Sequence, residues 1–166
     1  LIEATEKGYT KIVEALINGG ADLTRVDEYD KTALILAAEK GYLEIVNALL
    51  GKHNVDVDAE DEVGNTALMY AAEKGYLEIS QALITAGADV NLGDDDGMTA
   101  LMFAAGYDRL DVLNALINGH ADVNLVNEYD NTALMYAAAK GYTRIVRELL
   151  KKHDSKTTNG SSRSSS

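Results

Sequence analysis

Three histidines are the first residues in this chain whose chemistry could hold a metal ion. His53, His120 and His153 recur at one position of a repeated sequence pattern, a position that Gly20 and Gly87 hold elsewhere. Packed helices lie about 8–10 Å apart, whereas zinc binds histidine nitrogens at about 2.0–2.1 Å. We therefore predict that these histidines stand at left-handed helix ends, where histidine is tolerated better than most residues, and that they bind no metal.

An acidic run, Asp94-Asp95-Asp96-Gly97, is the second candidate for cation chemistry. A calcium-binding EF-hand loop needs an oxygen ligand at its first position and a glutamate at its last, with a glycine sixth. Counting back from Gly97 places Leu92 first and Phe103 last, so both ligand positions fail. Since the chain has no cysteine, thiolate ligands and cysteine nucleophiles are excluded as well.

Motifs for catalysis are missing from the sequence. It contains no HExxH stretch, no GxxxxGK[ST] phosphate-binding loop and no GxSxG nucleophile elbow. Carboxylates are abundant, but none lies at a distinctive spacing from a nucleophile or base. We predict no catalytic residue, no metal and no cofactor, and we predict that the chain is not an enzyme.

The net charge and the length of the apolar runs argue against two further classes of partner. The chain has 15 Lys and Arg against 27 Asp and Glu, a formal net charge of -12, whereas proteins that bind nucleic acids present a basic face. No apolar run approaches the roughly 18 residues of a membrane-spanning helix. We expect neither a nucleic acid nor a membrane as partner.

The elements that position these residues form a tandem repeat. Thr-Ala-Leu begins at Thr32, Thr66, Thr99 and Thr132, at spacings of 34, 33 and 33. Each unit contains two short apolar stretches separated by a glycine, which predicts two helices. In the second unit Thr32 is expected to cap the first helix and Gly41 to end it. Helices this short bury their apolar faces only by stacking on neighbouring units.

This pattern resembles the ankyrin-repeat family, whose unit of 33 residues combines a β-turn with two helices and carries a T-P-L-H-x-A signature. The chain departs from the signature by having alanine for its proline and isoleucine or methionine for its histidine. The resemblance implies an all-α solenoid of about five helix-turn-helix units with protruding β-turn fingers, over residues 1–153. The unit boundaries are 1–26, 27–60, 61–93, 94–126 and 127–153, and 154–166 is expected to be a disordered Ser-rich tail or linker.

The resemblance also implies a binding surface, because ankyrin proteins use their turns and first helices as a concave recognition face. It implies an intracellular, cytoplasmic location as well. Transferred to this chain, the face selects variable turn positions and one exposed position of each first helix. The candidate partner-binding residues are Tyr29, Glu62, Val63, Tyr70, Asp95, Asp96, Met98, Phe103, Tyr107, Glu128, Tyr129 and Tyr136.

Two interpretations stay open for some of these aromatic residues. Tyr70, Phe103 and Tyr136 hold one repeat position, and they either line the groove or pack as core. In the fourth unit Asp108 replaces the glycine that ends the first helix, which costs roughly 1 kcal/mol at positive φ. That change is either neutral drift or a reshaped turn that directs Tyr107 toward a partner.

The acidic charge is concentrated between the units. The stretches 21–31, 54–65, 88–98 and 121–131 hold 16 acidic and two basic residues, whereas the rest of the chain is slightly basic. Such a field attracts basic proteins over a distance of about 8 Å at physiological salt. We expect a monomer that binds a basic protein or peptide; the alternative is a spacer or scaffold segment without a ligand of its own.

Overall fold

The computed structural model describes the backbone of residues 1–160 and the side chains of residues 1–153. Within the described backbone there are ten helices and no extended strand, only isolated antiparallel bridges such as that between Val26 and Thr32. The helices are α1 Ile2–Glu6, α2 Thr10–Asn18, α3 Ala33–Lys40, α4 Leu43–Leu50, α5 Ala67–Lys74, α6 Leu77–Thr85, α7 Ala100–Gly106, α8 Leu110–Asn118, α9 Ala133–Lys140 and α10 Thr143–Gly160.

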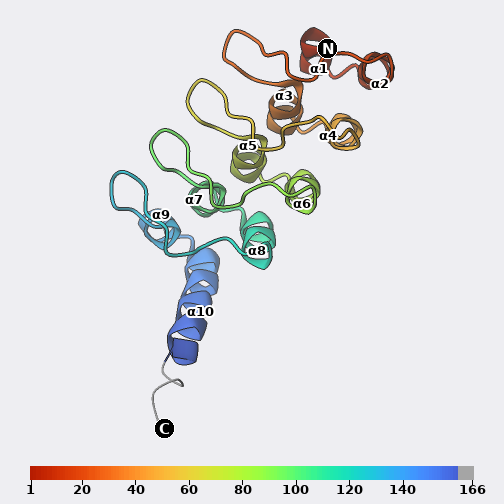
Figure 1. The fold of residues 1–166 in the computed structure, drawn as a ribbon. Coiled ribbons are helices and arrows are strands. Elements are labelled where there is room, and N and C mark those ends of the chain that lie inside the picture. The colour runs from red at the N-terminus through yellow and green to blue at the C-terminus, as the bar shows by residue number, and fades with distance from the viewer. Residues whose placement is uncertain (161–166) are drawn as a thin grey trace.

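The helices are arranged in two parallel rows (Figure 1). The first helices of the units, α1, α3, α5, α7 and α9, form one row, and α2, α4, α6 and α8 form the other. Four loops project from the side of the first helices. We call them the fingers and define them by residues 27–31, 61–65, 94–98 and 127–131. The prediction of an all-α solenoid of about five helix-turn-helix units is confirmed.

Threonine and glycine set the limits of the first helices. The Thr32 hydroxyl accepts a hydrogen bond from the Ile35 amide at 3.2 Å, and three later threonines cap α5, α7 and α9 in the same way. Gly41 ends α3 at φ 80°, a left-handed conformation that suits a residue without Cβ. Both predictions are confirmed, as is the positive φ of Asp108, at 59°.

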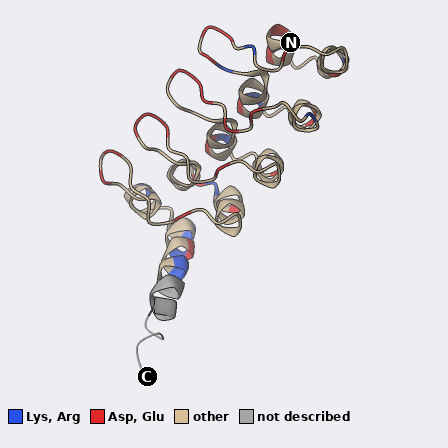
Figure 2. Cartoon of the chain, in the orientation of Figure 1, with Lys and Arg blue, Asp and Glu red and all other residues tan. Residues whose placement is uncertain are grey.

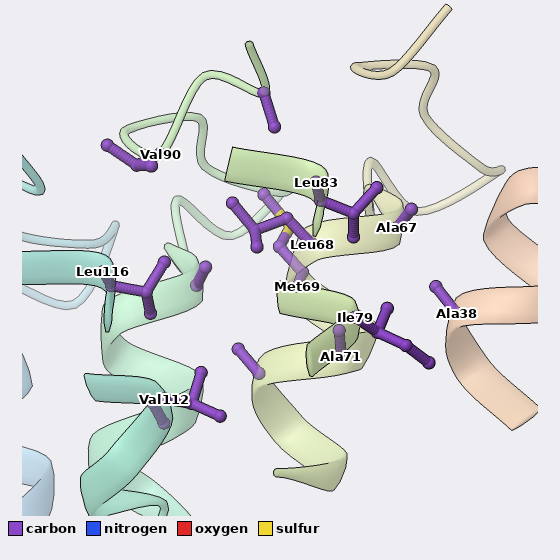
Figure 3. Close-up of a cluster of buried hydrophobic side chains, with 14 of the residues drawn as sticks. Ala38, Ala67, Leu68, Met69, Ala71, Ile79, Leu83, Val90, Val112 and Leu116 are labelled. Carbon is purple, nitrogen blue, oxygen red and sulfur yellow. The ribbon is translucent and has the colours of Figure 1, made fainter. Parts of the chain in front are cut away.

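The core lies between the two rows and continues from one unit into the next. Leu68 and Met69 of α5 lie beside Leu83 of α6, and Val112 and Leu116 of α8 face them (Figure 3). All five side chains are at most 2 % exposed. The apolar residues of α4 and α6 recur at helical spacing, so that one face of each helix enters this core.

The two ends of the stack show how much each unit depends on its neighbours. Ile12 is 51 % exposed, whereas Ile45, at the same position of the next unit, is fully buried. Met135 in the last unit is 51 % exposed, whereas Met102, one unit earlier, is 1 % exposed. The residue type is similar within each comparison, so the adjacent unit supplies the burial.

Two details differ from the expectations. His120 has φ 70°, as predicted, but His53 and His153 do not adopt the left-handed conformation. His53 lies in a loop with one inserted residue, and His153 lies within α10. That helix continues to Gly160, beyond the point where a disordered tail was expected to begin, and residues 161–166 lie outside the described residues.

Two glycines provide a matched test of how closely the units approach one another. Gly41 and Gly141 both end first helices, at φ 80° and 74°. A Cβ on Gly41 would lie 2.8 Å from Cζ of the Tyr76 ring, whereas a Cβ on Gly141 would have no neighbour within 4 Å. We predict that Gly141→Ala lowers the free energy of unfolding by about 1 kcal/mol through backbone strain alone. Gly41→Ala should cost an additional 1–3 kcal/mol, roughly, through overpacking.

Urea unfolding followed by circular dichroism measures both losses. Equal losses for the two variants would show that the ring of Tyr76 moves aside at no cost.

Candidate functional site

Each finger is folded by one side chain at its start. The Oδ1 atom of Asp61 accepts hydrogen bonds from the amides of Val63 and Asn65, at 3.1 and 2.9 Å. The Asp61 amide in turn donates to the Asn65 carbonyl at 3.0 Å. Asp27, Asp94 and Asn127 make the equivalent bonds in the other fingers. The side chain of an aspartate or asparagine thus stabilises every finger by accepting hydrogen bonds from the backbone amides of the turn, as these residues do in turns generally.

The fourth residue of each finger has a left-handed conformation. Asp30 and Asp130 have φ 57° and 59°, and Gly64 and Gly97 have φ 80° and 77°. Aspartate is one of the few residues other than glycine that adopt this conformation readily. The left-handed conformation therefore explains why aspartate or glycine stands at this position of each finger.

Backbone hydrogen bonds join each finger to the next. The Glu62 amide donates to the Tyr29 carbonyl at 3.1 Å, and the Asp95 amide donates to the Val63 carbonyl at the same distance. The last bond, from the Glu128 amide to the Asp96 carbonyl, is 2.9 Å long. The bonded positions lie at the tips, so the tips of the four fingers form one continuous row. We call this the fingertip row: Glu28, Tyr29, Glu62, Val63, Asp95, Asp96, Glu128 and Tyr129.

The fingertip row is acidic and open to solvent. Figure 2 shows acidic segments at the outer ends of the fingers. All eight of its residues are exposed. Among its large hydrophobic side chains Tyr129 is the most exposed, at 66 %. None of its carboxylates belongs to an ion pair within the described part of the chain. The carboxylates are therefore available to a partner.

The structure separates the remaining predicted site residues from this row. Met98 is half-buried, and its sulfur accepts a hydrogen bond from Asn127 Nδ2 at 3.3 Å. Tyr107 is exposed but follows the C-terminal end of α7, whereas the finger joins the N-terminal end of that helix. Tyr107 therefore does not extend the fingertip row.

Tyr70 is half-buried, and its hydroxyl is bonded inside its own unit. The hydroxyl donates to Oδ2 of Asp61 at 2.6 Å, while the other carboxylate oxygen folds the finger. The Nζ atom of Lys31 lies 4.8 Å from the centroid of the same ring. Burial, followed by the bond to Asp61 and its negative charge, raises the pKa of Tyr70 to about 12. This tyrosine therefore remains a neutral donor across the physiological pH range.

The same contact recurs in the last unit with the direction of the hydrogen bond reversed. Asn127 Nδ2 donates to the Tyr136 hydroxyl at 2.7 Å. In the fourth unit Phe103 holds this position and has no hydroxyl to offer Asp94. Burial and the charges of Asp96 and Asp95 raise the pKa of Asp94, although the amides of Met98 and Asp96 oppose the shift.

Lys31 does not contribute an available charge to its finger. Its Nζ atom lies 2.9 Å from Oε2 and 3.0 Å from Oε1 of Glu39, at the end of α3. Burial alone would lower the pKa of Lys31, but the hydrogen bond to Glu39 and the nearby charges raise it overall. The lysine side chain thus connects the first finger, α3 and the ring of Tyr70.

Tyr70, Phe103 and Tyr136 combine features of both interpretations left open by the sequence. All three rings pack against the core, and all three remain partly exposed. Their contacts to the fingers went unrecognised in the sequence, although a signal exists. The tyrosines follow Asp61 and Asn127 at the same spacing of nine residues, and the unit with Phe103 lacks the pair.

One further carboxylate has a structural task that its sequence did not reveal. Asp58 Oδ1 accepts a hydrogen bond from the Asp89 amide at 2.9 Å, and Asn91 accepts one from the Asp122 amide at 2.8 Å. These bonds join the loops of successive units. Asp58 therefore serves the stack, and its charge is no indication of a partner.

We predict that Tyr70→Phe lowers the free energy of unfolding by about 1–3 kcal/mol, because it leaves a buried carboxylate oxygen without its donor. The folded pKa of about 12 exceeds the value of 10.0 in an unfolded chain. The contribution of the hydroxyl is therefore complete below pH 10.0 and is lost as the pH rises toward about 12. Urea unfolding across this pH range measures the effect.

Tyr76→Phe is the matched control, because the Tyr76 hydroxyl makes no hydrogen bond with the described residues. An equal loss of stability in the two variants would contradict the assigned role of the Tyr70 hydroxyl.

Within the described residues, no three histidine, aspartate or glutamate side chains are grouped so as to hold a metal ion. No helix in that part of the chain has the length and apolar character needed to cross a membrane.

Comparison with known protein families identifies the repeat. The model of ankyrin repeats, which describes three copies, matches residues 1–94 and again residues 68–159. A search of curated proteins gave no significant match. Ankyrin repeats are generally modules for protein–protein interaction, and their family is typically non-catalytic. The two matches cover almost the whole chain, and the chain belongs to the ankyrin-repeat family.

Proposed function

We propose that this chain binds a basic protein or peptide through the fingertip row and the adjacent faces of the first helices. The observation that carries the proposal is the row of exposed carboxylates without ion-pair partners among the described residues. After the structural tasks of other acidic residues are set aside, five carboxylates remain at the fingertips. They belong to Glu28, Glu62, Asp95, Asp96 and Glu128.

The hydrogen bonds between fingers support this proposal, because they fix the backbone that carries the carboxylates before a partner arrives. A preordered backbone loses little conformational entropy on binding. Its field extends about 8 Å at physiological salt, which accelerates association with a basic partner and strengthens discrimination against acidic ones.

Exposed aromatic rings give the same surface an apolar component. Tyr29 and Tyr129 lie at the two ends of the fingertip row and are 49 % and 66 % exposed. Tyrosine is enriched among the residues that dominate binding energy, since a broad ring is combined with a hydroxyl that tolerates water. We propose that these rings and the exposed edges of Tyr70, Phe103 and Tyr136 contact the partner.

Peptides selected from a random peptide library on the intact chain test the charge of the partner. We predict that the selected peptides are basic and that their affinity falls as salt concentration rises. Neutralising the fingertips with Asp95→Asn, Asp96→Asn and Glu128→Gln should weaken binding by roughly tenfold or more, mainly through slower association.

The control variant carries Glu44→Gln, Glu78→Gln and Asp111→Asn. These residues lie in the first turns of α4, α6 and α8, away from the fingers, and the net charge changes by the same amount. Equal weakening by the two variants, or affinity that is independent of salt, would exclude a specific role of the fingertips. A library that yields no binder would favour the spacer function.

Phe103→Leu tests whether the ring contacts the partner, because leucine is the residue that the second unit uses at this position, Leu36. A swap between apolar residues of similar size should cost less than about 1.5 kcal/mol of stability. We predict that it nevertheless weakens binding of the selected peptides by about fivefold or more, as loss of an aromatic anchor does. Isothermal titration calorimetry measures the affinity, and thermal unfolding measures the stability.

A variant that unfolds normally and binds with unchanged affinity would assign Phe103 to the core alone.

A further inference from the structure

A cavity of about 340 Å³ lies between the base of the first finger and the loop that leads to the second. Its apolar wall is formed by Leu23, Val26, Val55 and Ala59. Leu23 is buried, Val55 and Ala59 are half-buried, and Val26 is 45 % exposed at the surface. The cavity is therefore open to solvent, and its apolar wall is continuous with the core, to which Leu23 belongs and against which Val55 packs.

The sequence explains why this cavity exists. Ala59 holds the position of Leu92 and Leu125 in the two following units, and both leucines pack against the core. A methyl group in place of an isobutyl group leaves space that the neighbouring side chains do not fill. The cavity thus lies where the second unit departs from the leucine of the third and fourth units.

The rest of the lining consists of Thr24, Thr32 and three acidic residues, Asp30, Asp56 and Glu60. Each acidic residue is exposed, and none forms an ion pair within the described part of the chain. Glu60 stands where the next unit has Gly93, and no lysine or arginine lines the cavity. The cavity therefore combines an apolar wall with carboxylates and has no positive charge in its lining.

We propose that this cavity receives the side chain of one lysine or arginine residue of a protein partner. The aliphatic stem lies against the wall formed by Leu23, Val55 and Ala59, and the cationic head reaches the carboxylates. Long basic side chains bury their methylene groups in this manner while their charge stays near water. Charge complementarity selects this occupant, because a neutral apolar side chain would leave the carboxylates unpaired and an acidic one would be repelled.

The proposal deepens the proposed function, on which it rests, by naming a subsite for one residue of the basic partner. The subsite lies at the base of the fingers, and none of its lining residues belongs to the fingertip row. Substitutions can therefore separate the two regions.

The test uses the intact chain and two small probes, N-acetyl-arginine methylamide and N-acetyl-lysine methylamide, titrated by amide NMR. We expect saturable shifts of the Thr24 and Ala59 amides, which border the cavity. N-acetyl-citrulline methylamide, which has the shape of the arginine probe without its charge, should produce shifts at least about fivefold smaller. Equal shifts with citrulline, or none with either cation up to its solubility limit, would overturn the proposal.

Two variants locate the binding, and each introduces a residue that suits its position. Ala59→Leu fills the cavity with the side chain of Leu92 and Leu125, and Glu60→Gly removes a charge by using the residue of Gly93. We expect each variant to reduce the affinity for the arginine probe by about fivefold or more while the chain stays folded, and we expect Ala59→Leu to keep or raise the melting temperature. Unchanged affinity in folded Ala59→Leu would show that the probe binds elsewhere, and the subsite would be rejected.

The fingertip variant with Asp95→Asn, Asp96→Asn and Glu128→Gln distinguishes this subsite from the wider function. It should bind the small probes as the unaltered chain does. If the cavity variants leave peptide binding intact and the fingertip variant abolishes it, the proposed function stands and the subsite fails. If no basic peptide binds but the probes still occupy the cavity, the subsite stands and the proposed function fails.

Discussion

The structure depends on one constraint, which is that no helix pair of this chain can bury its own apolar face. Ile12 and Met135 lie half-exposed at the two ends, whereas residues of similar size at the equivalent interior positions have lost almost all contact with water. Every interior junction therefore contributes stability, and each unit must present the same shape to its neighbour. This requirement explains the regular spacing of the threonines that begin the first helices and the glycines that end most of them.

The stacking of the helix pairs fixes the positions of the fingers relative to one another. Because successive units are placed at a fixed separation, the Glu62 amide reaches the Tyr29 carbonyl, and the same bond recurs between the later fingers. The framework residues Asp61 and Asn127 fold their fingers with one side-chain atom and bond a tyrosine of the first helix with another. In these two units a tyrosine that packs against the core is thus bonded to the residue that folds the finger.

The sequence was sufficient to predict the helix pairs, the threonine caps and the positive φ of Gly41 and Asp108, because these features depend on local spacing and on backbone geometry within a unit. It was not sufficient to predict the hydrogen bond of Tyr70 with Asp61, which requires knowledge of how a finger lies against its helix. The role of Asp58 was missed for a related reason. Its partner is the Asp89 amide of the next unit, and no pattern within one unit records a bond between units.

Repetition makes the departures from it informative, because each position has internal controls in the same molecule. Where Phe103 replaces a tyrosine, the carboxyl of Asp94 has no hydroxyl donor from the first helix, and burial raises its pKa. Where Ala59 replaces a leucine, the stack retains its shape but leaves a cavity. Stacking requires neither change, since other units have tyrosine at the position of Phe103 and leucine at the position of Ala59. Some positions of a repeat protein accept substitutions that alter exposed charge or volume without disturbing the stacking. At these positions binding specificity can vary without loss of the fold.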